Sequence, residues 1–184
     1  MFVLGRMRHA IAPGGGDPSG FNLKVCNTQR NLDAQGRAQS ADIGTALAGA
    51  FSSNGVVVRS MIYSSQWCRC LDTARLIVDA LSASDVDYLG GASPSVVEEW
   101  GLNSFYQPEL GFSKEECIQQ LEDAIIKTAR ESQPRQGGKL VQTLLITHYV
   151  TVSAVTGRTV ASGGLVAYNS RTKESREISI DIQR

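Results

Sequence analysis

The chain has 184 residues, 42% of them hydrophobic, which suits one domain with a sizeable core and excludes global disorder. Lysine plus arginine number 18, as do aspartate plus glutamate, so the formal net charge is zero and no global basic field exists to bind nucleic acid. A local positive site must therefore be built from a few placed arginines.

The chain opens on a short apolar segment, Phe2–Leu4, which predicts a first strand and leads into Arg8 and His9. Residues 12–31 are rich in Gly, Pro, Asp and Asn and predict a long loop. Long ordered loops are often functional, and Gly14–Gly16 could cradle an anion. No Lys-Ser/Thr follows these glycines as in a P-loop, so a flexible turn is the alternative.

Two helices with a strand between them come next. The apolar spacing from Leu32 to Phe51 predicts a helix with Asp33 as its N-cap. Val56–Tyr63, rich in β-branched and aromatic residues, predicts a strand. A second helix is expected from Gln66 to Leu81, with Ser65 as its cap.

Arg69 falls in the first turn of this second helix. A cation is disfavoured near the positive end of the helix dipole, so a bound anion or a carboxylate would be its natural partner. Without Arg8 and His9 the default interpretation would be an exposed helix arginine.

Shorter signals follow. Val86–Tyr88 predicts a short strand, and Val96–Trp100 is a short apolar-to-acidic segment. The capping box Ser113–Glu116 predicts an amphipathic helix with apolar positions from Cys117 to Ala129. Pro134–Gly138 predicts a linker turn.

The last part of the chain predicts one more strand and helix and a terminal strand pair. Leu140–Thr147 is typical of a buried strand and ends at His148. Tyr149–Thr156 predicts a short helix, and Leu165–Tyr168 and Glu177–Ile182 predict the strand pair. Strands alternating with helices predict a three-layer α/β/α sandwich with a mostly parallel central sheet.

The two histidines, His9 and His148, each stand where a strand ends. A lone histidine is usually a packed or surface residue. Loops at the ends of parallel strands are, however, where α/β proteins build sites, so we expect one composite anion site with both. Arginine offers planar donors for phosphate oxygens, and imidazole can act as a nucleophile near neutral pH.

The four cysteines form no zinc pattern and are interpreted as small buried thiols; they are Cys26, Cys68, Cys70 and Cys117. A disulfide between Cys26 and Cys68 is the alternative in an oxidising compartment.

These motifs resemble those of the histidine phosphatase superfamily, the phosphoglycerate-mutase-like fold. Arg8-His9-Ala10 resembles its Arg-His-Gly signature, with alanine as in small single-domain phosphohistidine phosphatases. The segment Tyr63–Ala74 is similar to the Ser-Ser-x-x-x-Arg-x-x-x-Thr-Ala element. Thr147-His148 resembles the second histidine, and Thr28–Gln39 the lead into the first long helix. The resemblance runs from about residue 2 to residue 168, and we expect one domain over residues 1–184.

The resemblance also implies a mechanism. His9 attacks phosphorus and becomes phosphorylated, while Arg8, Arg69 and His148 hold the phosphoryl oxygens. A carboxylate protonates the leaving oxygen, and water then releases phosphate. Fixed guanidinium groups supply the positive charge, so neither a metal nor another cofactor is expected.

Three carboxylates compete for the role of proton donor. Glu99 is the best match to the family's donor, which follows a strand in the middle of the chain, and Glu98 is next. Asp17, in the long loop, is the competing candidate. Arg30 and Tyr149 are expected as substrate contacts beside Asp17, and the alternative for Arg30 is a solvated arginine before a helix.

The expected function is a metal-independent phosphatase for phosphomonoesters or phosphohistidine, acting through a phosphohistidine on His9. The alternatives are a phosphomutase of the same fold and a catalytically silent phosphate-binding module. The expected partner is a phosphorylated small molecule or phosphoprotein, with no nucleic acid and no membrane span. A cytoplasmic location is expected, or a periplasmic or secreted one if a leader precedes this sequence.

Overall fold

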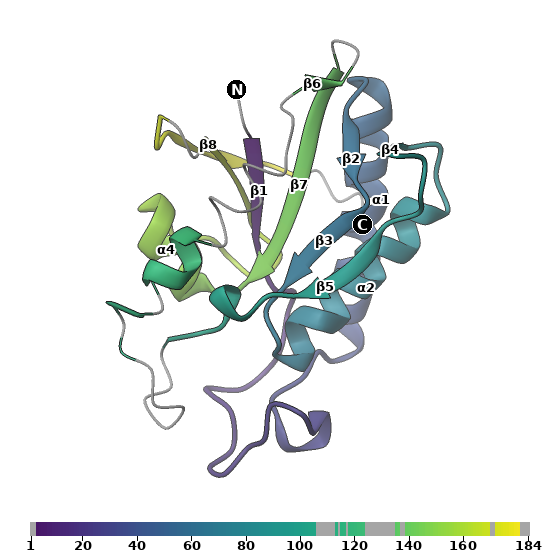
Figure 1. Cartoon of the computed structure of the whole chain (residues 1–184). Helices are drawn as coiled ribbons and strands as arrows, with labels where there is room; N and C mark the ends of the chain where they lie inside the picture. Colours follow the sequence, from purple (N-terminus) through teal and green to yellow (C-terminus); the bar gives the residue numbers. More distant parts are fainter. Residues whose placement is uncertain are drawn as a thin grey trace.

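The computed structural model describes residues 3–105, 113, 115, 116, 118–123, 135, 136, 139–169 and 172–180. Over these residues nine strands form one mostly parallel sheet, and helices cover both of its faces (Figure 1). This architecture confirms the three-layer α/β/α sandwich expected from the sequence.

The labelled elements are, in chain order, β1 (Val3–Arg8), η1 (Cys26–Thr28), α1 (Ala34–Ser53), β2 (Val57–Arg59), β3 (Met61–Ser64), α2 (Cys68–Ser82), β4 (Asp87–Leu89), β5 (Ser95–Glu98), η2 (Trp100–Leu102), β6 (Arg135–Gln136), β7 (Lys139–Thr147), α4 (Tyr149–Thr156), β8 (Leu165–Asn169) and β9 (Ser175–Ile178). Residues 115, 116 and 118–123 are also helical.

The central path of the sheet has the order β4-β2-β7-β1-β8-β9, and β3 joins β5 to the same β7. The strand expected over Val56–Tyr63 is in fact two strands. β2 pairs with the first half of β7 through Val57 and Val58, whereas β3 pairs with its second half through Tyr63 and Ser64. The strand is interrupted between β2 and β3 because its two parts pair with different neighbours on their other side, β2 with β4 and β3 with β5.

Side-chain alternation along the strands builds a core on each face of the sheet. Leu144 and Ile146 point to the face that α1 and α2 cover (Figure 1), where they join the largest apolar cluster. Leu145 points to the other face and packs with Tyr63 and with Leu121 of the helical segment 118–123. Burial on both faces explains why three consecutive residues near the end of β7, 144–146, are all apolar.

The helix starts agree with the sequence in two places and differ in one. Asp33 caps α1 by accepting from the backbone N–H of Gly36 at 2.8 Å. The capping box at 113–116 is present, since Glu116 N donates to Ser113 Oγ at 3.1 Å. The predicted start of α2 at Gln66 was wrong, because the helix begins at Cys68 and its N-cap is Trp67. Ser65 instead hydrogen-bonds other side chains.

Most of the remaining segments shift by a few residues. α4 has the expected bounds, the short strand expected at Val86–Tyr88 is β4, and the last strand is β9 rather than Glu177–Ile182. The linker expected at Pro134–Gly138 contains β6, which pairs antiparallel with the start of β7. The other residues of this linker lie outside the described residues. The same is true of Cys117 and Ala129, the first and last apolar positions expected in the preceding helix.

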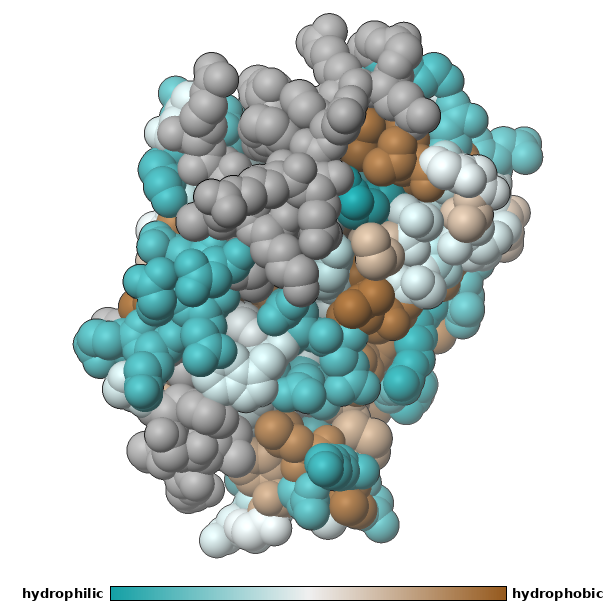
Figure 2. Space-filling view, viewed as in Figure 1, coloured by the Kyte–Doolittle hydropathy of each residue, from teal (hydrophilic) through white to brown (hydrophobic). Residues whose placement is uncertain are grey.

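Among the described residues, no helix combines the length and apolar character needed to cross a membrane. Figure 2 shows a face on which hydrophilic residues surround separate apolar patches, one of them at the lower end, where the loop between β1 and α1 lies.

Gly36 lets the segment after His9 lie directly against α1. A Cβ at this position would be 1.9 Å from the carbonyl oxygen of Ile11. Because that neighbour is backbone, Gly36→Ala should lower the free energy of unfolding by more than about 2 kcal/mol. Gly49→Ala, on the same helix with open space around it, should instead raise it by about 0.5–1 kcal/mol. Urea unfolding of both variants checks this, and equal effects would contradict it.

Candidate active site

The strand register brings the two histidines together. Arg8 of β1 pairs with Thr147 of β7 in parallel, so both strands end at the same edge of the sheet. His9 and His148 follow them directly, and their rings lie edge to face with centroids 5.5 Å apart. The backbone N–H of His9 donates to Thr147 O at 2.9 Å, which fixes this arrangement.

A cavity of about 140 Å³ opens at this edge, and it is lined by His9, Gly15, Gly16, Asp17, Arg30, Arg69, Ser104, His148 and Tyr149. Six of these were candidates from the sequence. The expected residues Arg8, Glu98 and Glu99 do not line it. The sequence did not single out Ser104, and for Gly15 and Gly16 the only signal was the glycine run itself.

His9 is held as a neutral imidazole whose Nε2 is the unprotonated nitrogen. Its Nδ1 lies 2.8 Å from the carbonyl oxygen of Ala10. A carbonyl can only accept, so Nδ1 carries the proton and Nε2 keeps its lone pair. Burial, followed by the charges of Arg69, Arg30 and Arg8, lowers the pKa of His9 to about 3.

This shift has a consequence for stability. The folded-state pKa of His9 lies below its ordinary value near 6.5, so only the unfolded chain binds the proton between these values. The stabilising contribution is complete above pH 6.5 and is lost as the pH falls towards 3. Protonation of His9 in the unfolded chain should therefore lower the free energy of unfolding by about 2 kcal/mol as the pH falls from 7 to 5. Urea unfolding of wild type and His9→Asn checks this, and an equal loss in both would contradict it.

His148 is fixed by a chain of hydrogen bonds from the β3–α2 connection. The backbone N–H of Gln66 donates to Asn103 Oδ1 at 2.9 Å, which marks that atom as the oxygen. Ser65 then donates its hydroxyl proton to Asn103 Oδ1 at 3.0 Å and accepts from His148 Nε2 at 2.9 Å. His148 Nε2 therefore carries the proton and faces Ser65. Burial, with the charge of Arg69 next, lowers the pKa of His148, which keeps it neutral.

Arginine supplies the positive charge. The Nε–H groups of Arg8, Arg30 and Arg69 are buried and have no hydrogen-bond partner among the described residues. Arg8 donates through Nη1 to Val160 O and stacks on Tyr149, with 5.4 Å from its guanidinium carbon to the ring centre. Buried donors without a partner are costly, so these three groups favour an anionic ligand.

Asp17 does not stand free in the cavity. Its Oδ1 accepts from Arg69 Nη1 at 2.8 Å and its Oδ2 from Arg69 Nη2 at 3.2 Å. Burial raises the pKa of Asp17, but hydrogen bonds and charge from Arg69, with donors on Arg30 and Trp67, outweigh it and hold the pKa below its ordinary value. An ionised carboxylate is a poor proton donor.

The two mid-chain glutamates lie outside the cavity lining. Glu99 accepts from the backbone N–H of Gly101 at 3.3 Å and so caps η2. Glu98 accepts from Gln66 Nε2 at 3.3 Å and lines a separate cavity of about 440 Å³. The backbone N–H of Glu99 donates to Ser64 O, so its backbone lies next to the β3–α2 connection.

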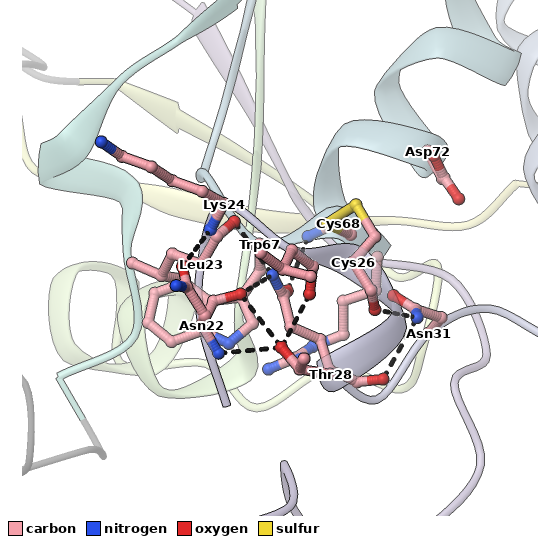
Figure 3. The surroundings of a disulfide bond; sticks show 12 residues. Asn22, Leu23, Lys24, Cys26, Thr28, Asn31, Trp67, Cys68 and Asp72 are labelled. Carbon is pink, nitrogen blue, oxygen red and sulfur yellow. Dashed lines mark hydrogen bonds between the residues drawn. A yellow bond between two sulfur atoms is a disulfide. The ribbon is translucent and has the colours of Figure 1, made fainter. Parts of the chain in front are cut away.

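A disulfide ties the loop between β1 and α1 to the start of α2. Cys26 and Cys68 are bonded, so the interpretation of both as free thiols was wrong, whereas Cys70 is a buried free thiol. Figure 3 shows the hydrogen bonds that surround the bond, among them those from Asn31 Nδ2 to Cys26 O and from Thr28 Oγ1 to Val25 and Asn22 carbonyls. Gln29 Oε1 also accepts from the backbone N–H of Cys68 at 3.0 Å.

Similarity to known proteins is seen in structure rather than in sequence. No family model and no curated protein matches the sequence. The protein histidine phosphatase SixA in complex with tungstate is similar with a TM-score of 0.59 and 13% identity, over 97% of this chain and 95% of that one. A mycobacterial glucosyl-3-phosphoglycerate phosphatase is similar with a TM-score of 0.55 and 11% identity, over 96% of each chain. Phosphoglycerate mutase from Plasmodium falciparum is similar with a TM-score of 0.51 and 12% identity, over 97% of this chain and 91% of that one.

Proposed function

We propose that this chain, which has the fold of the histidine phosphatases, is a phosphatase that acts through a covalent phosphohistidine on His9. One observation carries the proposal. A neutral imidazole with its Nε2 lone pair free shares a small cavity with Arg30 and Arg69, whose buried Nε–H groups have no partner among the described residues. A nucleophile beside unpaired cationic donors is what phosphoryl transfer needs.

The chemistry runs in two displacements. His9 Nε2 forms a bond to phosphorus as the bond to the leaving group breaks, and the arginine N–H groups stabilise the charge on the equatorial oxygens. Water then attacks phosphorus and gives a proton to the carboxylate that protonated the leaving group, the P–N bond breaks, inorganic phosphate is released, and His9 is regenerated. The hydrogen bond from Nδ1 to Ala10 O stabilises the ring while it carries the phosphoryl group. Arg8 does not line the cavity and contributes its positive charge from beside His9, and no metal ion is part of this proposal.

Glu99 is the proposed proton donor, since Asp17 is committed to Arg69. This role requires the Glu99 carboxyl to exchange Gly101 N–H for the leaving oxygen. Glu99→Gln should then slow an alkyl phosphate by at least about 10-fold more than p-nitrophenyl phosphate, whose leaving group needs little protonation. Steady-state rates on both substrates check this. Equal slowing would show that another group donates the proton.

The substrate class is a phosphoprotein or a phosphorylated small molecule. The similar SixA is named as a protein histidine phosphatase, and the mycobacterial neighbour as a sugar-phosphoglycerate phosphatase. Both kinds of substrate present a terminal phosphoryl group of the size that a 140 Å³ cavity admits.

Trapping the intermediate tests the proposal. The protein is mixed with ³²P-labelled acetyl phosphate in excess chelator, quenched in alkali and analysed by peptide mapping. The expected result is acid-labile label on the peptide that contains His9. Hydrolysis that depends on a bisphosphate activator would favour the phosphomutase alternative. Phosphate binding with no label and no hydrolysis from pH 5 to 8 would favour the silent binding module.

A further inference from the structure

Arg69 has five N–H donors, and the structure accounts for three of them. Nη1 donates to Asp17 Oδ1 at 2.8 Å and to Arg30 O at 3.2 Å, and Nη2 donates to Asp17 Oδ2 at 3.2 Å. Nε has no partner among the described residues. The donors left over are the Nε–H and the second Nη2–H, which are parallel and form one edge of the guanidinium plane.

We infer that Asp17 is a positioning residue, which clamps one edge of the Arg69 guanidinium so that the other edge, Nε–H and Nη2–H, presents two parallel donors to the phosphoryl group. The inference rests on the proposed function and deepens it. Asp17 was a candidate proton donor and substrate contact from the sequence, and the geometry gives it a different role. It would act through Arg69 rather than on the substrate.

Asp17 is itself held in place, as a clamp must be. Trp67 Nε1 donates to its Oδ2 at 3.1 Å, and the backbone N–H of Arg30 donates to its Oδ1 at 2.9 Å. With the two bonds from Arg69, the carboxylate accepts at least four hydrogen bonds, from three of the described residues. The side chains of Asp17 and Arg69 are only 1% and 5% exposed, so water competes little for this pair.

The clamp makes physical sense for phosphoryl transfer. A long arginine side chain has many rotamers, and catalysis gains when its donors are fixed before the charge develops on the phosphoryl oxygens. A bidentate carboxylate fixes both the plane and the rotation of a guanidinium. Trp67 restricts the guanidinium further, because the guanidinium carbon of Arg69 lies over the Trp67 ring, 5.7 Å from its centre.

A double-mutant cycle tests whether Asp17 acts through Arg69. Asp17→Asn keeps the shape but turns one oxygen into an N–H donor that faces other donors. With Arg69 present, this change should weaken inhibition by inorganic vanadate by at least about 10-fold and lower kcat more than it changes KM. In the Arg69→Ala background it should weaken vanadate binding by less than about twofold. Equal weakening in both backgrounds would overturn the inference.

Two further variants make the test independent of folding and of charge loss. Asp72→Asn breaks an exposed pair with Arg37 of the same 2.8 Å length and should leave vanadate binding unchanged. If Asp17→Asn does not fold, Trp67→Phe removes one donor to Asp17 and keeps a smaller aromatic ring at this position. It should weaken vanadate binding about threefold with Arg69 present and not at all in Arg69→Ala; the same loss in both would overturn the inference.

The dissociation constant for vanadate, measured by calorimetry, needs no turnover. A wild type that binds vanadate without hydrolysing any phosphate ester would therefore contradict the proposed phosphatase activity and still decide the role of Asp17. A wild type that does not bind vanadate at all would overturn both.

Discussion

His9→Ala should abolish turnover, with kcat lower by at least about 10⁴-fold on p-nitrophenyl phosphate in excess chelator. The reason is that His9 lines the cavity and the hydrogen bond from its Nδ1 to Ala10 O leaves the lone pair on Nε2. Arg30 and Arg69 remain in the variant, so the site should still bind an anion.

Phosphate-dependent thermal stabilisation is the control for this variant. We expect His9→Ala to keep most of the stabilisation that phosphate gives the wild type, since the arginine donors remain. Loss of both turnover and phosphate binding would point to a collapsed site rather than a missing nucleophile. Near-normal turnover in a clean preparation would refute the mechanism.

Reduction of the disulfide should have the largest effect on stability. Cys26 and Cys68 are 42 residues apart in the chain, and a closed loop of that length stabilises the fold by about 4 kcal/mol through the entropy of the unfolded chain. Urea unfolding with and without dithiothreitol measures the loss. Activity should fall with it, because the tethered loop carries Asp17 and Arg30, which line the cavity.

The double variant Cys26→Ala/Cys68→Ala is the matched control, because it keeps the buried thiol of Cys70. It should unfold like the reduced wild type and should not respond to dithiothreitol. A change in the stability of this variant on addition of dithiothreitol would show that the effect of the reductant does not come from the Cys26–Cys68 bond. Confirmation of the bond would favour the periplasmic or secreted location over the cytoplasmic one, since disulfides persist in oxidising compartments.

The sequence by itself determined the elements whose signals are local. The buried strand before His148, the Asp33 cap and the capping box at 113–116 each depend on neighbours within a few residues, and the structure has all three. The motif around Arg8 and His9 pointed to the fold that the structural comparisons confirm. Strand-end histidines were also local evidence for where a site would lie.

Tertiary structure decided what depends on residues far apart in the chain. The split of Val56–Tyr63 into β2 and β3 follows from pairing with two parts of β7, which no local pattern encodes. The same holds for the site chemistry. Asp17 meets Arg69 across 52 positions, and Ser65 meets His148 across 83. A carboxylate's charge state and partner are set by such contacts, so the sequence could name Asp17 but only the fold could show that it clamps an arginine.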